Sequence, residues 1–264
     1  MKHPIFRPLL AAMVLACTAC GQTIWNQRTE GVGIRLEYLS PAFATTSPGH
    51  EFTSQIVTLG GRVPVGKLLC VLVEAPMAWE TQNNPIASST KNGFGNVFVG
   101  LEVGTISSPF FLDLGARPFL KQDVMVSGFG GYYGDFDRCE AYLQEMISYR
   151  LGVNIASTER HGFVYRLRVG PTWWVPERGN ETTTIIDYGA KAGFDDGAIS
   201  VYAGITGRWN TTVDVEKNKY HHLGFDLGYR INGVRPAFFY RVPLEKDLSD
   251  VISRTIGGSV AVEL

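Results

Sequence analysis

Residues 257–264 read GGSVAVEL, and this stretch decides the fold. Its apolar Val260, Val262 and Leu264 alternate with one small and one acidic residue, which is the period of a β-strand with one apolar face. At the edge of an open sheet, such a strand exposes backbone groups that invite pairing with another chain. A closed barrel removes the edge, so we expect this strand to pair with the first strand of the chain, near Val32.

The same period of two recurs along the chain in segments of about ten residues, the length that a tilted strand needs to cross a bilayer. The clearest segments are EGVGIRLEYL (30–39), NVFVGLEVG (96–104), ISYRLGVNI (147–155), GFVYRLRVG (162–170), ISVYAGITGRW (199–209) and HLGFDLGYR (222–230). No stretch after residue 20 approaches the roughly 18 unbroken apolar residues of a membrane helix. The sequence therefore predicts an all-β chain that crosses the membrane with strands.

Length and charge narrow the function classes. The chain has 264 residues, a size that suits one large all-β domain, and a formal net charge of −1. A nearly neutral chain has no basic footprint for nucleic acid, so we expect no nucleic-acid partner. No paired spacing of cysteine and histidine suggests a zinc site, and we expect no metal and no cofactor.

The first residues have the anatomy of an export signal. Basic Lys2 and Arg7 precede an apolar run over 9–16 and then small residues around two cysteines. We expect residues 1–20 to be a signal peptide and residues 21–264 to form the barrel. The sequence VLAC, which ends at Cys17, also fits a bacterial lipoprotein cleavage box, so lipidation of Cys17 and ordinary cleavage are both left open.

The connections between the strands alternate in length. Twelve antiparallel strands are expected over 30–39, 51–63, 67–77, 95–105, 109–119, 147–157, 161–174, 183–193, 197–208, 218–230, 233–243 and 254–264. Every second connection is a tight turn: PVG, ISS, STER, DDG and NG. The others are long and polar. Short periplasmic turns and long extracellular loops are typical of a single transmembrane β-barrel in the bacterial outer membrane, and outer-membrane lipid is then a partner.

The segment over 120–146 does not fit the strand pattern. It begins like a strand and ends like a short helix that either Asp135 or Asp137 could cap. We expect an extracellular loop that extends a hairpin or folds into the barrel mouth, because long loops in compact folds are usually functional. The alternative is a thirteenth strand followed by a helix.

The polar register of the strands gives the expected pore lining, in which basic residues outnumber acidic ones. Its members are Arg35, Glu37, Glu102, Asp113, Arg117, Arg150, Arg166, Arg168, Asp187, Lys191, Arg208, Asp226, Arg230, Arg235 and Arg241. Aromatic residues at the loop ends of the strands are expected to form an interfacial girdle. These are Trp79, Trp173, Trp174, Trp209 and Tyr220.

Four further residues raise alternatives. Cys70 lies in the lumen register and Cys139 in the long loop, so a disulfide that ties the loop into the pore and two unpaired thiols are both left open. His221 and His222 lie at the loop end of one strand, and a histidine on a barrel wall suggests a lipid hydrolase. Neither histidine has a serine at a recognisable catalytic spacing, so we expect no enzyme and no catalytic residue.

One short stretch resembles a known family. NGFGNVFVGLEV, followed by FFLDLGARPFL, resembles the outer-membrane transporters assigned to the MetA-pathway of phenol degradation, whose strands open on a glycine-rich step. Gly93, Gly95, Asn96, Gly100 and Leu101 match that step, and the resemblance covers about a fifth of the chain. It implies a transporter-like barrel for hydrophobic or aromatic compounds.

Taken together, these features predict a passive outer-membrane channel for small solutes, with a weak preference for anions set by the basic lining. The loop that carries Cys139 is the expected constriction. The second hypothesis is a closed structural or adhesion barrel whose charges pair across the lumen and whose loops bind partners. A barrel-borne lipid hydrolase that uses His221 or His222 is the third.

Overall fold

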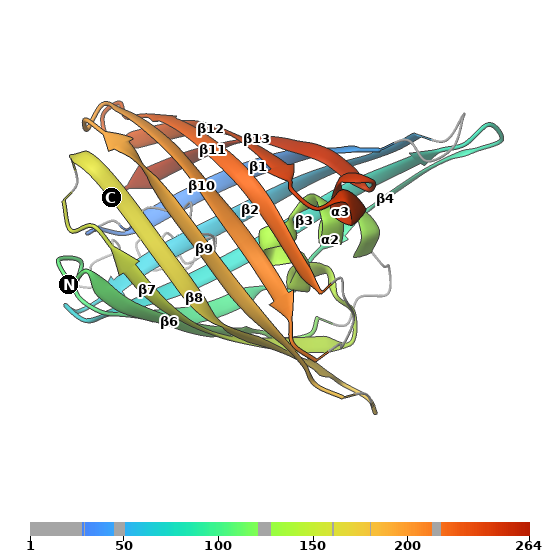
Figure 1. Ribbon diagram of the computed structural model, residues 1–264, viewed down its shortest axis with the longest axis horizontal. Coiled ribbons are helices and arrows are strands. Elements are labelled where there is room, and N and C mark those ends of the chain that lie inside the picture. The colour runs from blue at the N-terminus through green and yellow to red at the C-terminus, as the bar shows by residue number, and fades with distance from the viewer. Residues whose placement is uncertain are drawn as a thin grey trace, which may run out of the picture.

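The computed structural model describes residues 28, 30–44, 51–120, 128–159, 161–179, 181–212 and 218–264 (Figure 1). The predicted signal peptide over 1–20 and Cys17 lie outside these residues. Within them, one antiparallel sheet closes on itself to form a barrel, with two short helical segments inside it and a third at its rim.

The wall contains twelve strand positions, as the sequence predicts. β4 and β5 lie end to end along β3 and share one position, and the pairing of β2 with β3 closes the sheet. The strands are β1 (Gly33–Phe43), β2 (Glu51–Val65), β3 (Leu69–Asn83), β4 (Ser88–Phe94), β5 (Phe98–Val103), β6 (Phe110–Arg117), β7 (Met146–Ala156), β8 (Gly162–Pro176), β9 (Thr183–Asp195), β10 (Ile199–Asn210), β11 (Lys219–Tyr229), β12 (Val234–Pro243) and β13 (Ile252–Glu263).

The expected closing seam is confirmed. β13 pairs antiparallel with β1, so that Val260 lies opposite Leu36. The backbone N–H of Leu264 donates to the carbonyl of Val32 over 2.9 Å and continues this ladder beyond the strand. The apolar alternation of residues 257–264 is therefore one side of an inter-strand seam and not an exposed edge.

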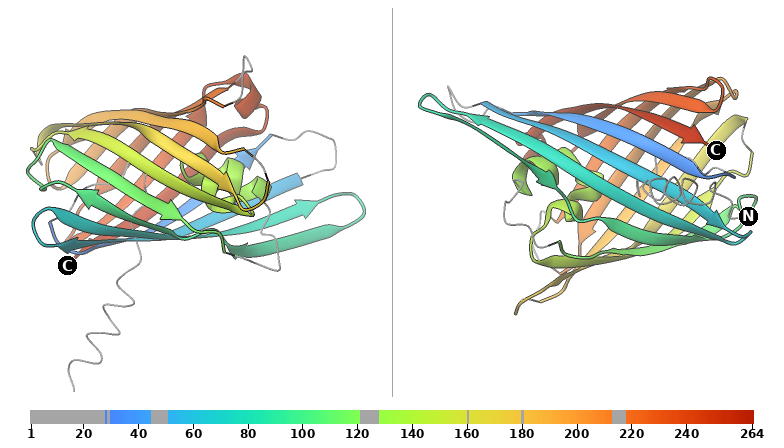
Figure 2. Two further views of the ribbon diagram at one scale, coloured as in Figure 1. Left: turned by 90° about the horizontal axis from the view of Figure 1, so that it is seen from below. Right: turned by 180° about the vertical axis from the view of Figure 1, so that it is seen from behind.

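The two ends of the barrel differ as predicted. The connections β2–β3, β5–β6, β7–β8, β9–β10 and β11–β12 lie at one end, which we call the turn end, together with the C-terminus (Figure 1). The longer connections lie at the opposite, loop end (Figure 2). In outer-membrane barrels the turn end faces the periplasm and the loop end faces outward.

One polar connection is itself a hairpin. The predicted third strand ends at residue 77, but β3 continues to Asn83 and turns into β4, and this hairpin projects from the loop end (Figure 1). This stretch is rich in polar residues, and the Thr81 and Thr90 hydroxyls form a cross-strand hydrogen bond of 3.0 Å. Such pairs stabilise strands without an apolar face, which is why hydrophobic periodicity alone ends the strand too early.

The outer face of the barrel is apolar. Leu36 in β1, Val201 in β10 and Leu227 in β11 each expose half or more of their surface, and residues of the same parity are exposed around the wall. A continuous apolar surface of this extent is not stable in water and marks contact with lipid. Among the described residues, no helix is long and apolar enough to cross a bilayer.

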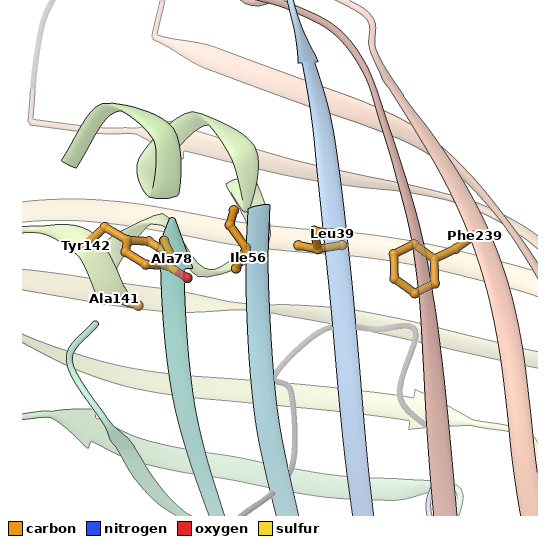
Figure 3. Packing of buried hydrophobic residues seen from close by; sticks show 6 residues of the cluster. All are labelled: Leu39, Ile56, Ala78, Ala141, Tyr142 and Phe239. Carbon is orange, nitrogen blue, oxygen red and sulfur yellow. The ribbon is translucent and has the colours of Figure 1, made fainter. Parts of the chain in front are cut away.

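The helical segments lie at the loop end. α2 (Gly128–Gly134) and the 3₁₀ segment η1 (Phe136–Tyr142) fold into the barrel, while α3 (Lys246–Ser249) lies at the rim beside β13 (Figure 2). An apolar cluster joins the inner helices to the wall (Figure 3). Its members are Leu39, Ile56, Ala78, Ala141, Tyr142 and Phe239. The 120–146 segment is therefore an inserted loop and not a thirteenth wall strand.

Candidate pore and the plug inside it

The predicted pore-lining residues lie on the inner face of the wall. Ten are buried: Glu37, Glu102, Arg117, Arg150, Arg168, Asp187, Lys191, Arg208, Asp226 and Arg241. Arg35, Asp113, Arg166 and Arg235 are partly buried. Arg230 is the exception, because it follows the last residue of β11 and is exposed at the turn-end rim. The period of two places these side chains because successive residues of a strand point to opposite faces.

The inserted loop fills the lumen near the loop end. We call residues 128–143, which contain α2 and η1, the plug. Its charged residues Asp135, Arg138 and Glu140 are buried inside the barrel, and they meet charged residues of several wall strands. The prediction that this loop folds into the barrel mouth is confirmed, although the sequence pattern does not indicate which of its residues contact the wall. That the loop constricts a pore stays a prediction.

Arg138 is the most enclosed charge of the plug, with no exposed surface. Its guanidinium forms ion pairs with Glu37 of β1 and, over 2.5 Å, with Asp135 at the start of η1. Asp135, one of the two residues that the sequence offers as a helix cap, occupies the N-cap position, but its side chain makes no capping hydrogen bond. Instead, the carboxylate helps to balance Arg138, because a buried charge without a partner is strongly destabilising.

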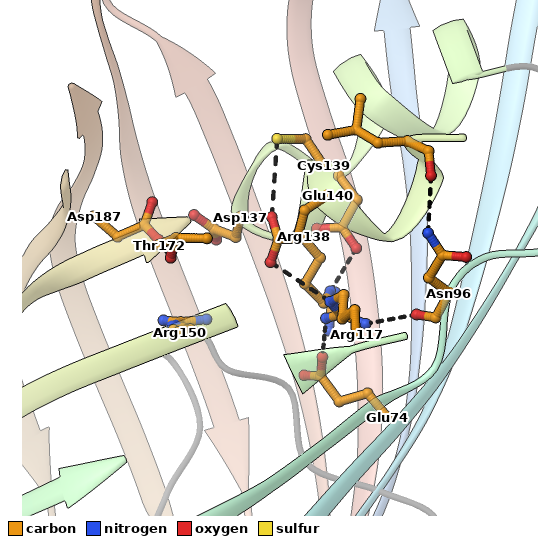
Figure 4. Close-up of polar contacts among 12 residues, drawn as sticks. Glu74, Asn96, Arg117, Asp137, Arg138, Cys139, Glu140, Arg150, Thr172 and Asp187 are labelled. Carbon is orange, nitrogen blue, oxygen red and sulfur yellow. Dashed lines mark hydrogen bonds and ion pairs between the residues drawn. The ribbon is translucent and has the colours of Figure 1, made fainter. Parts of the chain in front are cut away.

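Arg117, the last residue of β6, also joins the plug to the wall (Figure 4). It forms an ion pair with Glu74 of β3, and its Nε lies 3.5 Å from Glu140 Oε1. Its Nη1 donates to the carbonyl of Asn96 over 2.9 Å. Asn96 also donates from Nδ2 to the carbonyl of Leu143, which ties the end of the plug to the gap between β4 and β5.

Arg208 of β10 makes a third connection. Its Nη2 lies 2.8 Å from Glu140 Oε2, its Nε lies 3.0 Å from Asp187 Oδ1, and its Nη1 lies 2.7 Å from the Cys139 sulfur. Arg241 of β12 pairs with Asp137 over 3.0 Å. Wall arginines from β6, β10 and β12 thus bind acidic residues of the plug, and one plug arginine binds an acidic residue of β1.

Two plug carboxyl groups have shifted pKa values of opposite direction. Burial, only partly offset by Arg138, raises the pKa of Asp135 to about 6. Burial also opposes ionisation of Glu140, but Arg208 and Arg117 outweigh it and hold the pKa of Glu140 below its usual range. Glu140 is therefore ionised near neutral pH, whereas Asp135 gains a proton under mild acid.

A glycine lets α2 lie against the wall. A Cβ at Gly130 would stand 2.9 Å from Glu80 Oε2 and 3.1 Å from the Ser54 Cβ, so glycine allows this approach without a shift of the Glu80 side chain. The Gly130 N–H then donates to the Glu80 carboxylate over 3.2 Å. The glycine-rich sequence GFGG, which looks like a flexible linker, instead allows close packing against β2 and β3.

The lumen is organised differently toward the turn end. Asp113 of β6 accepts from Arg168 and from Asn154, each over 2.8 Å. Glu102 of β5 pairs with Arg62 of β2 and with Arg28, which precedes β1. Arg28 and Arg62 belong to the lumen although our predicted lining omitted them, and the parity of β2 would have identified Arg62.

A cavity of about 200 Å³ lies inside this turn-end half. Its wall is formed by the turn-end parts of β7, β8, β9, β10, β12 and β13 and the adjoining turns, together with Arg28. The charged residues that line it are Arg28, Glu159, Arg166, Lys191, Asp195, Arg230, Arg235 and Glu263. The lumen is therefore closely packed by the plug near the loop end and hollow toward the turn end.

The two cysteines form no disulfide, which decides between the alternatives that the sequence leaves open. Cys70 and Cys139 are both free and buried. Cys70 is the second residue of β3 and pairs with Glu102 of β5, at the turn end. Cys139 lies in the plug beside Arg208, near the loop end. The two thiols therefore lie toward opposite ends of the barrel.

Only three of the five residues predicted for the aromatic girdle lie on the outward register. Trp79, Trp173 and Trp209 lie on the outward register of β3, β8 and β10. Trp174 and Tyr220 have the opposite parity and face the lumen; the Trp174 indole nitrogen is buried without a hydrogen-bond partner, and Tyr220 contacts Phe136 of the plug. Position near a strand end does not decide which face a side chain takes, whereas its register does.

The adjacent histidines also take opposite faces. His222 faces the lumen, where its ring contacts Phe136 at 4.5 Å. His221 faces outward between Tyr188 of β9 and Glu245, and its Nε2 lies 2.5 Å from the Tyr188 hydroxyl. The hydroxyl beside His221 thus belongs to a tyrosine and not to a serine, so the geometry gives no support to a serine-dependent lipid hydrolase.

No family model matches the chain, and no curated protein matches it. Among solved structures, it is similar to an outer membrane channel from Pseudomonas putida F1, with 9% identity over 91% of this chain and 98% of that one and a TM-score of 0.62. The translocator domain of the autotransporter NalP from Neisseria meningitidis has 11% identity over 98% and 96%, with a TM-score of 0.53. The NanC porin has 12% identity over 88% and 100%, with a TM-score of 0.51.

At these identities the comparisons establish the fold. The resemblance to the phenol-degradation family stays a prediction, because no family model matches. The closed twelve-strand wall, the apolar outer face and the difference between turn end and loop end are those of outer-membrane proteins. The chain is thus a β-barrel of the bacterial outer membrane with the architecture of porins and channels.

Proposed function

We propose that the barrel is a passive channel for small solutes and that the plug narrows it. The observation that carries this proposal is the division of the lumen: the plug occupies the loop-end half, while a cavity of about 200 Å³ remains in the turn-end half. The wall residues alone do not fill the interior. A single inserted segment does so, and its displacement would join the cavity to the loop end.

The contacts that hold the plug support a movable constriction. Apart from one small apolar cluster and the contacts of the Phe136 ring with Tyr220 and His222, the contacts described above between plug and wall are ion pairs and hydrogen bonds. When a buried ion pair separates and both partners enter water, the hydration that they regain offsets the attraction that they lose. Such pairs therefore contribute little net stability to the inserted position of the plug. The ion pairs therefore define where the plug lies, but the plug buries too little apolar surface against the wall to be fixed there permanently.

The distribution of charge supports a weak preference for anions. Near the loop end, acidic plug residues balance the wall arginines Arg117, Arg208 and Arg241. Toward the turn end, the lining retains more basic than acidic side chains, Arg166 and Lys191 among them. Fixed positive charge along a water-filled lumen raises the local concentration of anions.

Charge reversal on β8 tests this function. Arg166→Glu and Arg168→Glu together should shift the reversal potential measured in planar bilayers under a salt gradient toward cation preference. Arg254→Glu, on an exposed position of β13, is the control for charge reversal outside the lumen. Because Arg168 pairs with Asp113, heat-modifiable migration on a gel should first show that the double variant folds. An unchanged reversal potential in a folded, conducting variant would refute the assignment of these residues to the pore.

The closed structural barrel is the second candidate, and the buried ion-pair network favours it. Arg138 and Arg117 are almost fully enclosed, as a permanent plug requires. This function predicts a folded barrel that conducts no ions, with partner binding that depends on the loops. Deletion of the projecting β3–β4 hairpin should then abolish binding to the partner without altering the electrical silence.

A further inference from the structure

The glycine–asparagine step over 93–96, which the sequence pattern singles out, lies where the wall departs from a regular ladder. β4 ends opposite Met77 of β3, and β5 begins opposite Glu74 of the same strand. Residues 95–97 therefore face only two residues of β3, so the wall contains a β-bulge with one extra residue at this point. Bulges redirect the groups of the bulged strand, and they are frequent next to functional sites.

The bulge directs Asn96 toward the plug. Its backbone N–H donates to the carbonyl of Ala141 over 2.6 Å, and its own carbonyl accepts from Arg117 over 2.9 Å (Figure 4). Its side-chain amide donates to the carbonyl of Leu143 over 2.8 Å and accepts from the backbone N–H of Leu120 over 3.1 Å. Leu120 follows β6, and Leu143 is the last residue of the plug. One asparagine side chain thus clips together two backbone positions, Leu120 and Leu143, which we call the neck of the plug.

Gly95 allows the plug to approach the bulge this closely. A Cβ at Gly95 would stand 2.7 Å from the carbonyl oxygen of Ala141 and 3.2 Å from Cε1 of Tyr142. The nearer atom belongs to the backbone, so a larger side chain at this position would push the plug away from the bulge. Gly95 is buried and Asn96 is 4% exposed. The two neighbouring residues thus have complementary functions: the glycine admits the plug, and the asparagine binds it.

The neck and the body of the plug are held by different interactions. The body, which contains α2 and the first part of η1, meets the wall through charged groups such as the pair of Arg138 with Glu37. The neck is held by the neutral amide of Asn96, and the adjoining Ala141 and Tyr142 belong to the apolar cluster that joins plug and wall. An asparagine amide does not titrate, whereas an ion pair depends on the charge of both partners. A change that weakens ion pairs therefore releases the body before the neck.

We propose that Asn96 is the positioning residue about which the plug moves: the neck stays clipped to the bulge while the body leaves its place against the wall and returns. This inference rests on the proposed channel function and deepens it, because it identifies the fixed end of the constriction. A body that remains tethered beside its site returns to it as an intramolecular event, which favours fast closing. The step over 93–96 thereby serves the plug as well as the wall.

Amide hydrogen exchange of the refolded wild-type barrel in detergent, resolved by residue with NMR, tests the pivot without any measurement of current. The N–H groups of Asn96 and Leu120 bond to acceptors at the neck, whereas the N–H of Gly130 in the body donates to Glu80 of the wall. Movement of the body alone exposes only the last of these. The protection factors of Asn96 and Leu120 should exceed that of Gly130 at least tenfold. Equal protection, or weaker protection at the neck, overturns the proposal.

Single-channel recording of Asn96→Ala separates a pivot from an ordinary contact between plug and wall. A pivot is engaged in both positions of the plug, so its loss should leave the opening rate unchanged. The less restrained plug should find its place more slowly and lengthen the mean open time about tenfold, the scale of one buried hydrogen bond. Asn92→Ala, on an exposed position of β4, is the matched control and should behave as the wild type does. A higher opening rate, or an unchanged open time, overturns the pivot.

The two measurements separate this inference from the channel function. A silent barrel in which the neck amides are more protected than Gly130 keeps the pivot and refutes the channel. A conducting barrel with equal protection, or with an unchanged open time in Asn96→Ala, keeps the channel and refutes the pivot. Heat-modifiable migration on a gel first shows that the variant folds. If it does not fold, the exchange measurement on the wild-type barrel decides alone.

Discussion

Arg138 is the residue on which the position of the plug most depends. It is fully buried between Glu37 of the wall and Asp135 of the plug. Arg138→Gln would remove the cation that pairs with Asp135 and leave Glu37 with Arg35, at a cost of about 3–5 kcal/mol for a broken buried pair. We expect the plug to shift and single-channel conductance to rise several-fold. The exposed Arg254→Gln controls for charge, and equal conductance of the two variants would show that Arg138 does not hold the constriction.

Asp135 gives the plug a dependence on pH. Its pKa is raised to about 6, so the inserted plug binds this proton more tightly than hydrated aspartate does. Its stabilising contribution is therefore complete below pH 3.8 and is lost as the pH rises through about 6. Conductance should fall when the pH is lowered from 7 to 5. Glu140, whose pKa is lowered, titrates below this range.

Asp135→Asn isolates this effect from other titrating groups. Asparagine keeps the size of the side chain but has no proton to gain, so the fall in conductance between pH 7 and pH 5 should disappear. Single-channel recording at both values, with the wild-type barrel measured in parallel, provides the comparison. If the variant retains the full pH response, another group is responsible.

At this scale, the sequence predicts the wall better than the plug. Glu37, Arg117 and Arg208 were assigned to the lumen because the pleat of a strand fixes which residues share a face. Arg138 and Glu140 lie in a segment without periodicity, and nothing local indicates that they meet wall residues such as Glu37 and Arg117, which are distant in sequence. Such pairs arise only from the tertiary fold.

The α2 helix lies close enough to the wall for a covalent test of plug movement. A Cβ at Gly130 would stand 3.1 Å from the Ser54 Cβ, slightly under the separation typical of disulfides, and the Glu80 carboxylate can move to admit it. Oxidised Ser54→Cys/Gly130→Cys should conduct less than its reduced form, and dithiothreitol should reverse the difference. The two single variants serve as controls. Equal currents in the oxidised and reduced states would mean that conduction does not require the plug to move.

At the scale of elements, hydrophobic periodicity recovers the twelve strand positions and the alternation of turns and loops. It misses the outer parts of β3 and β4, because threonine and serine stabilise this hairpin without an apolar face. It also leaves the 120–146 segment ambiguous. The α2 helix contains four glycines among seven residues, a composition that disfavours an isolated helix, so packing against the wall determines its structure.

For the whole molecule, the sequence predicts the apolar outer face and the closing seam. It does not predict how far the lumen is open. The same charged inner face is compatible with a water-filled pore and with a sealed interior. Only the placement of the plug distinguishes the two halves of the lumen, and that placement depends on contacts among β1, β6, β10, β12 and η1.

Single-channel conductance of the refolded wild-type barrel in a planar bilayer tests the channel most directly. A variant in which residues 121–143 are replaced by a short glycine–serine linker gives the comparison, after heat-modifiable migration has shown that both proteins fold. We expect discrete steps from the wild-type barrel and larger steps from the variant. A correctly folded wild-type barrel that remains electrically silent would contradict the account, and conduction by the variant alone would assign the closure to the plug.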